Sequence, residues 1–201
     1  MHALLARSDE VLLSALELSD QDGAVLNEVL EALPAPIYTT DPDGVVTFFN
    51  SACVGFAGRL PEVGKDRWCV TWKLYTEDGD FLPHDQCPMA VSIASKTRIR
   101  GVCAVAERPD GGRVMFTPFP TPILDDDGTL VGAINLLLDI TDVRQIEDLQ
   151  AQARRCRRLI SGVSDPLTTD ALLTFATECD AKAAELEAEL PHLPTPAAAR
   201  A

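Results

Sequence analysis

The side chains that could do redox or metal chemistry in this 201-residue chain are six cysteines and three histidines, scattered along the sequence. The cysteines are Cys53, Cys69, Cys87, Cys103, Cys156 and Cys179, and no two of them form a C-x-x-C pair. A structural zinc site needs clustered thiolates or imidazoles, so we expect no metal site. Because the chain shows no secretion signal, we expect the cysteines to be reduced and mostly buried.

His84 and the pair Cys87-Pro88 are close in sequence, and together they could ligate haem iron. The structural alternative puts His84 in the first turn of a helix that Asp85 caps, with Pro88 in the same turn. No cofactor is therefore predicted, and haem at His84 and Cys87 is kept as an alternative.

Motifs of known catalytic machinery are missing from the sequence. It contains no Ser-His-Asp set, no G-x-S-x-G elbow, no P-loop and no H-E-x-x-H motif. We therefore expect no enzymatic activity. An enzyme working through Cys87 or Cys103 is the remaining catalytic alternative, and it would need a thiolate that alkylates quickly at neutral pH.

Charge and hydropathy exclude several classes of partner. The chain has 17 Lys and Arg against 31 Asp and Glu, a formal net charge of −14, which disfavours nucleic acid and anionic membranes. No stretch of about 18 apolar residues could span a bilayer. The first ten residues are interrupted by Arg7, Asp9 and Glu10, so they do not form a signal peptide. We therefore expect a cytoplasmic protein without membrane insertion.

The apolar spacing along the chain predicts which elements position these groups. Residues 1–33 are expected to form N-terminal helices that end at Pro34. Strands are then predicted at 37–40, 45–49, 98–108, 113–123 and 129–140, with short helices at 50–58 and 83–95. The region 60–80 is ambiguous. The predicted fold class is therefore α+β, with a five-stranded antiparallel sheet and short helices in residues 34–141.

Beyond Asp142 the apolar residues follow a heptad spacing typical of paired helices. They are Ile146, Leu149, Ala153, Cys156 and Ile160, and, in a second helix from near Thr169, Leu172, Ala176, Cys179, Ala183, Leu186 and Leu190. We therefore expect a two-helix extension over 142–190, with a loop at 161–168. Three prolines in 191–201 predict a disordered tail.

Several of these segments together resemble a PAS domain. They are Asp41-Pro42-Asp43-Gly44, Asn50 with Ala52, Pro61-Glu62-Val63-Gly64, Asp125-Asp126-Asp127-Gly128 and Asp139-Ile140-Thr141, within residues 28–159. The stretch 82–90 is similar to a version found in bacterial sensor-kinase PAS modules. The resemblance implies a five-stranded antiparallel sheet that senses a ligand or redox state, or that mediates dimerisation. The layout is similar to free-standing single-PAS regulators that act on histidine kinases, since the roughly 60 residues after Thr141 contain no G-x-G ATP lid.

The last strand meets the first helix of the extension at Asp139, Ile140, Thr141 and Asp142. Thr141 or Asp142 could cap the helix, and Gln145 completes a capping-box pattern with Asp142. The joint is either a plain structural cap or the element that transmits strain from the sheet to the helix, and both interpretations stay open.

The last strand is apolar on both faces, so both faces must be covered, either by the chain's own helices or by a second subunit. The second case favours a homodimer. Asn135 lies in one of these rows, where its buried amide would bind a ligand, the backbone or a water. The candidate pocket consists of Phe48, Phe56, Trp72, Leu74, Val91, Phe116, Asn135 and Leu137, and the alternative is a filled core. Cys53 and Cys69 lack the Asn-Cys-Arg sequence of flavin-binding light sensors.

A cluster of four arginines stands out in this acidic chain. The candidate interaction residues of the two helices are Ile146, Leu149, Arg154, Arg155, Arg157, Arg158, Leu172 and Leu186. The arginines could complement the helix dipole, or dock an acidic partner or the acidic last helix. We therefore expect a non-enzymatic signalling regulator that forms a homodimer and binds a signalling protein such as a histidine kinase. The alternative is a sensor of a small ligand, haem or redox state.

Overall fold

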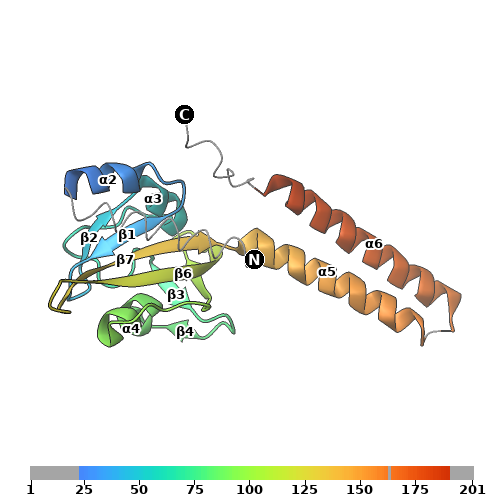
Figure 1. The fold of residues 1–201 in the computed structure, drawn as a ribbon. Coiled ribbons are helices and arrows are strands. Elements are labelled where there is room, and N and C mark those ends of the chain that lie inside the picture. Colours follow the sequence, from blue (N-terminus) through green and yellow to red (C-terminus); the bar gives the residue numbers. More distant parts are fainter. Residues whose placement is uncertain (1–22, 163, 191–201) are drawn as a thin grey trace. The chain divides into compact units, whose positions relative to one another are not determined.

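The computed structural model describes residues 23–162 and 164–190 (Figure 1). The helix predicted before residue 23 and the tail predicted after residue 190 lie outside the described residues. The chain divides after Ile140 into two compact units. Among the described residues, no helix combines the length and apolar content that crossing a membrane requires.

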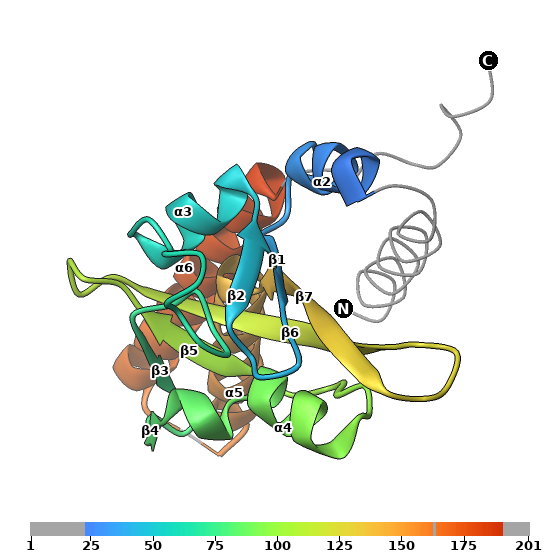
Figure 2. The same cartoon turned by 90° about the vertical axis from the view of Figure 1, so that its left-hand side faces the viewer.

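The first unit is built on an antiparallel sheet with strand order β2-β1-β7-β6-β5-β3-β4 (Figures 1 and 2). The strands are β1 (Ile37–Thr40), β2 (Val46–Phe49), β3 (Lys73–Tyr75), β4 (Phe81–Leu82), β5 (Ala104–Glu107), β6 (Arg113–Leu124) and β7 (Leu130–Asp139). All five predicted strands are present, although the one expected at 98–108 is reduced to β5. The fold class is α+β, as predicted.

The sheet has seven strands rather than five, because the ambiguous region 60–80 contributes to the extra hairpin β3–β4. The turn between these strands is closed by a hydrogen bond from the Thr76 amide to the Asp80 carbonyl at 2.8 Å. Gly79 has a φ of 93°, which glycine adopts without strain. The dipeptide Asp78-Gly79 is a hairpin signal of the kind that marks the other turns.

Strand β6 carries Pro118, Pro120 and Pro122, which is unusual in the middle of a sheet. The sheet tolerates them because β5 pairs only with Arg113–Phe116, so the rest of β6 has no strand neighbour on that side. There the Pro120 carbonyl accepts hydrogen bonds from the Ile99 amide and from Arg100.

Helices cover both faces of the sheet within the first unit. They are α2 (Gly23–Glu31), α3 (Ser51–Ala57), the 3-10 turn η1 (His84–Gln86) and α4 (Pro88–Ser95). α3 and α4 pack on the inner face, whose core includes Phe56, Met89 and Leu137. On the outer face Leu30 of α2 packs with Ile134 and other residues of the sheet. The two-sided apolar pattern of β7 is therefore explained without a second subunit.

The helix predicted at 83–95 begins later than expected. α4 starts at Pro88, which occupies the first turn, and Cys87 takes the N-cap position with extended backbone. Asp85 lies in the separate turn η1 and does not cap the helix. Proline at the first helical position has no amide that needs a partner, and this fixes the start of α4 there.

The second unit is a hairpin of two helices, α5 (Thr141–Ile160) and α6 (Pro166–Glu189), shown in orange and red in Figure 1. Its buried seam consists of Ala153, Ala176 and Cys179, with Leu149 and Cys156 packed against them. α6 begins three residues before the predicted Thr169. Asp165 caps it by accepting a hydrogen bond from the Thr168 amide at 2.9 Å, and Pro166 follows in the first turn.

Candidate functional site

Both polar atoms of the buried Asn135 amide have hydrogen-bond partners in the protein. Its Oδ1 accepts a hydrogen bond from the Phe119 amide at 2.9 Å, and its Nδ2 donates to the Tyr38 hydroxyl at 3.0 Å. The Tyr38 hydroxyl in turn donates to the Trp68 carbonyl at 2.8 Å. Asn135 therefore ties β7 to β6, to β1 and to the loop before β3, and its hydrogen-bonding groups have partners without a ligand.

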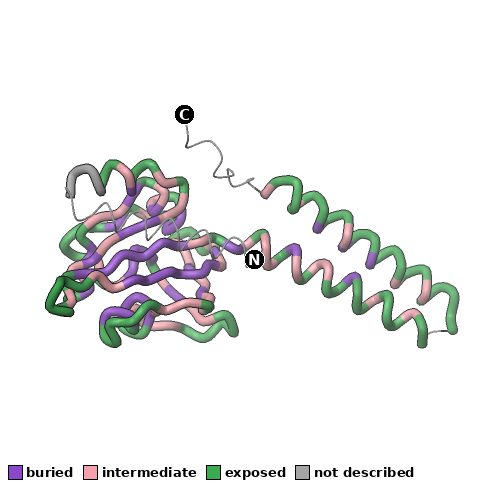
Figure 3. The backbone as a smooth tube through the Cα atoms, in the orientation of Figure 1, coloured by how far each residue is buried: buried purple, intermediate pink, exposed green. Residues whose placement is uncertain are grey.

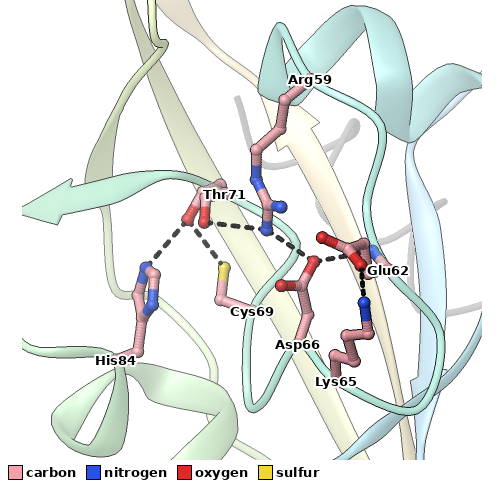
Figure 4. A network of polar contacts seen from close by, with 7 residues as sticks. All are labelled: Arg59, Glu62, Lys65, Asp66, Cys69, Thr71 and His84. Carbon is pink, nitrogen blue, oxygen red and sulfur yellow. Dashed lines mark hydrogen bonds and ion pairs between the residues drawn. The ribbon is translucent and has the colours of Figure 1, made fainter.

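A second set of polar contacts continues from this loop toward the surface (Figure 4). The Thr71 hydroxyl lies 3.1 Å from Cys69 Sγ and 3.4 Å from His84 Nε2. Arg59 Nη2 donates to the Thr71 carbonyl at 3.5 Å and to Asp66 Oδ2 at 2.6 Å. The contacts join the loop 58–72 to the turn η1. The same loop carries Trp68, whose carbonyl accepts the hydrogen bond from the Tyr38 hydroxyl.

Burial sets the protonation of this network. It raises the pKa of the Tyr38 hydroxyl and of the Cys69 thiol, and it raises the pKa of Cys87 to about 12. Burial also lowers the pKa of His84, and the nearby Arg59 lowers it further. At neutral pH these groups are therefore uncharged, and the ion pair of Arg59 with Asp66 provides the charge of the network.

These residues do not fit the cofactor chemistry considered above. Cys87 is buried and its Sγ donates to the Trp68 carbonyl, and His84 Nε2 is occupied by the Thr71 hydroxyl, so both candidate haem ligands are engaged within the protein. Cys53 is also engaged within the protein, because its Sγ donates to the Ile37 carbonyl, and burial raises its pKa to about 12. Among the described residues, no three His, Cys, Asp or Glu side chains gather where a metal could bind.

The candidate pocket is only partly assembled. Phe56, Leu74, Phe116 and Leu137 meet in the inner core with Asn135 at its margin, and the rings of Phe56 and Phe116 pack edge to face at 5.2 Å. Three other predicted members lie elsewhere: Phe48 packs on the outer face, and Trp72 and Val91 are 44% and 46% exposed. Val91 points outward because α4 buries the side that carries Met89 and Ile93. Trp72 lies in irregular chain just before β3, so no strand alternation directs its side chain into the core.

Sequence reasoning missed Tyr38, Cys69, Thr71, Arg59 and Asp66 as members of the network. No short motif contains them, because they come from β1 and from the irregular loop before β3. A buried tyrosine next to a buried asparagine in paired strands was the available signal, since Tyr38 and Asn135 are register partners.

The joint between the units is short. β7 ends at Asp139, Ile140 is buried and donates its amide to the Met115 carbonyl at 2.9 Å, and α5 begins at Thr141. Thr141 and Asp142 are therefore helical residues rather than caps. Asp142 lies in the first turn, where the positive end of the helix dipole stabilises a carboxylate.

The interaction residues of the hairpin fall into two groups. Among the apolar ones, Ile146 is buried, Leu149 packs on the seam, and Leu172 and Leu186 are half-buried. Among the arginines, Arg157 forms an ion pair with Asp180 of α6. Arg154, Arg155 and Arg158 are exposed and form no ion pair with any described residue.

The family model of the PAS fold matches residues 30–145, which is more than half of the chain. The chain belongs to the PAS fold family, whose members are generally sensory modules of signalling proteins. The PAS domain expected from the sequence is thus confirmed. The matched residues extend from α2 into the first turns of α5.

Comparison with solved structures finds several similar chains. One is an RNA-binding Light-Oxygen-Voltage receptor, 20% identical over 59% of this chain and 33% of that one, with a TM-score of 0.44. A second is the LOV domain of a blue-light activated histidine kinase from Erythrobacter litoralis, 18% identical over 54% and 97%, with a TM-score of 0.42. A third is the PAS domain of the fruit-fly ELK potassium channel, 12% identical over 59% and 96%, with a TM-score of 0.44. A search of the curated proteins gave no match.

Proposed function

We propose that this protein is a non-enzymatic signalling regulator that forms a homodimer and modulates a signalling partner such as a histidine kinase. The observation that carries the proposal is the continuity of β7 with α5. β7 holds Asn135 at the centre of the buried network and ends at Asp139, with one residue before the helix.

This geometry lets a change in the core reach the helix by a short route. Asn135 and Leu137 lie on the inner face of β7, and the Asn135 side chain holds the Phe119 amide of β6. Any rearrangement of the Tyr38–Asn135 pair alters the position of β7 against its neighbours. The joint of Asp139, Ile140, Thr141 and Asp142 passes this displacement to α5, provided that the core has two arrangements with different affinity for the partner.

The packing of side chains in the inner core supports regulation by protein contacts rather than by a bound metabolite. The polar groups around Asn135 are satisfied, and aromatic and aliphatic side chains pack together on the inner face. The buried thiols Cys53 and Cys87 keep their protons at neutral pH, which supports a role without nucleophilic catalysis.

The test begins with the full chain as bait in a native lysate, followed by purification of a captured kinase. We expect the chain to change the rate at which that kinase phosphorylates itself. Insertion of one glycine between Ile140 and Thr141 lengthens the connection between β7 and α5 by one flexible residue and should abolish the change. One glycine inserted into the exposed turn at Asp125–Asp127 is the matched control and should leave the effect intact.

Two results would overturn this proposal. The first is an unchanged rate of kinase phosphorylation with the natural chain, and the second is an equal effect of the chain with the joint insertion. Mass spectrometry and an absorbance spectrum of freshly purified protein test the sensor alternative. If the protein retains a small molecule or haem, the sensor alternative holds, and the protein is regulated by a bound ligand rather than by protein contacts.

A further inference from the structure

The α5–α6 hairpin has two unlike halves. We define the tip as residues 154–175 and the base as residues 141–153 together with 176–189. The tip has four arginines and two aspartates, whereas the base has eight acidic and two basic residues. All exposed large apolar side chains of the described hairpin belong to the tip: Leu159, Leu167, Leu173 and Phe175.

One side of the hairpin is already occupied by its own polar contacts. Arg157 pairs with Asp180, and Gln150 donates to Glu187 at 2.9 Å. At about 100° per residue, Leu159 lies about 200° round α5 from Arg157, and Phe175 about 140° round α6 from Asp180. Leu159 and Phe175, which are 52% and 47% exposed, therefore lie on the opposite side.

Charged residues on that side follow the same spacing. Arg155 is four residues before Leu159, so the two share one face of α5. On α6, Glu178 and Glu189 are three and fourteen residues after Phe175, which places both within about 60° of it. Both glutamates are exposed and form no ion pair with any described residue. The face thus has an exposed arginine and exposed apolar side chains on the tip and an acidic end at Glu189, with Glu178 near the boundary between the tip and the base.

The seam between the helices is too small to explain the tip. It buries Ala153, Ala176 and Cys179, with Ala183 farther along α6, and these side chains are short. Larger apolar residues on the face are left beside the seam, with Leu149 and Leu186 half-buried at the base. Leu159 and Phe175 are thus two large apolar side chains exposed on one face and edged by charges, an arrangement found at protein interfaces.

We propose that this face binds a second copy of the chain, with the two hairpins antiparallel. The inference rests on the dimerisation in the proposed function and names its surface. In this arrangement a two-fold axis places the tip of each hairpin on the base of the other, so that one surface is complementary to itself. Arg155 then faces the acidic end, and Leu159 and Phe175 cover Leu149 and Leu186 in a four-helix bundle.

Sedimentation velocity of the full chain tests the proposal with a pair of matched variants. Arg155→Glu should raise the dissociation constant of the dimer at least about tenfold, because it brings like charges together in the interface. Arg154→Glu makes the same change of charge at an exposed position about 140° from Leu159, and should leave the constant within about twofold. Circular dichroism checks that both variants keep their helices.

A charge swap separates an interface from a folding defect. The double variant Glu178→Lys, Glu189→Lys should also form a weakened homodimer. Mixing it with Arg155→Glu should restore a dimer that contains one copy of each variant, which native mass spectrometry identifies by mass. Restoration supports the antiparallel arrangement, because a misfolded chain cannot be rescued by a second variant.

The proposal is overturned if the natural chain stays monomeric at tens of micromolar, if Arg155→Glu and Arg154→Glu have equal effects, or if mixing restores nothing. An effect on kinase phosphorylation that persists in Arg155→Glu with an unweakened dimer would refute this interface alone. A dimer that follows the expected pattern without any kinase effect would refute the proposed function alone. Capture of an acidic amphipathic helix from another protein by this face, in place of the second copy, would also overturn the proposal.

Discussion

The PAS domain and the hairpin bury their side chains in different ways (Figure 3). The inner core of the PAS domain draws large residues from β1, α3, β3, α4, β6 and β7, among them Tyr38, Leu74 and Phe116. The hairpin seam uses short side chains from only two helices, with Ala153 and Ala176 fully buried. The amount of apolar surface removed from water is therefore much larger per residue in the PAS domain. The hairpin therefore relies more than the PAS domain on close helix pairing and on capping.

The polar groups of the PAS domain and of the hairpin also differ in how deeply they are buried. In the core, Asn135 and Tyr38 are buried, uncharged and hydrogen-bonded, so the loss of the Tyr38 hydroxyl would leave the buried Asn135 Nδ2 without its partner. On the hairpin, the pairs Arg157–Asp180 and Lys182–Glu185 are exposed and contribute little to stability. Specific hydrogen bonding thus fixes the PAS interior, while charge on the hairpin is free to select a partner.

The largest expected effect is a cavity in the PAS core. Phe116→Ala removes the ring that packs edge to face on Phe56, and it should lower the free energy of unfolding by about 3–5 kcal/mol. Both tryptophans, Trp68 and Trp72, lie in the PAS domain, so urea unfolding followed by their fluorescence measures this unit. Val131→Ala, at a position 49% exposed, is the control and should cost less than about 1 kcal/mol. Equal effects of the two substitutions would show that the core is loosely packed.

A larger side chain in the hairpin seam tests whether the two units unfold separately. Ala176→Leu forces a bulky residue into a close helix contact and should destabilise the hairpin by about 1–3 kcal/mol. Hydrogen exchange should show weaker protection in α5 and α6, with the tryptophan transition in urea unchanged. Ala184→Leu, on the exposed side of α6, should leave protection as it is. A tryptophan transition that shifts along with the hairpin would show that the units are energetically coupled.

Loss of the α6 cap should have a smaller and more local effect. Asp165→Ala removes the acceptor for the Thr168 amide and hydroxyl, and protection of the first turn of α6 should fall about threefold to tenfold. Asp170→Ala, one turn later and exposed, provides the matched control. The Thr168 donors lower the pKa of Asp165, so the contribution of this cap is present at neutral pH and is lost in acid. Equal loss of protection in both variants would contradict the capping role.

The smallest effect concerns the pH dependence of the PAS domain. Burial and the charge of Arg59 lower the pKa of His84, against the opposing carboxylates of Asp66 and Asp85. Above a pH of about 6.5 the histidine is neutral in both the folded and the unfolded chain. Below that pH the unfolded chain binds the proton first, so stability falls until the pH reaches the lower pKa of the folded state. The urea midpoint between pH 7 and pH 5 should therefore fall more in the natural chain than in His84→Gln, and parallel curves would refute this role.

Much of the fold follows from local pattern. Strands β1, β2, β6 and β7 were predicted from alternation and turn residues, because Asp41–Gly44 and Asp125–Gly128 require a reversal of the chain whatever surrounds them. The seam residues Ala153, Ala176 and Cys179 follow from heptad spacing, since only one face of each helix can meet the other. The start of α4 was misplaced because the helix was begun at Pro83, although Pro88 was already placed in its first turn, and the start of α6 was misplaced because Pro166 was assigned to a loop.

The candidate site was harder to predict than the fold. Asn135 was singled out as a buried amide, but its partners Tyr38 and the Phe119 amide come from other strands and are set by their register. Trp72 and Val91 were assigned to the interior by residue type, although each points outward. Hydropathy shows that a residue can be buried, and the packing of neighbouring elements decides whether it is.

The sequence by itself determined the PAS family, the positions of most strands along the chain, the strand-to-helix boundary near Asp139–Asp142 and the pairing faces of the two helices. These depend on turn residues, capping and periodicity, which act over a few residues. The tertiary structure alone decided that Asn135 is satisfied within the protein, that the loop 58–72 links Tyr38 to His84, and that Leu159 and Phe175 stay exposed beside a thin seam. Such features require contacts between segments far apart in the chain, and no local pattern specifies them.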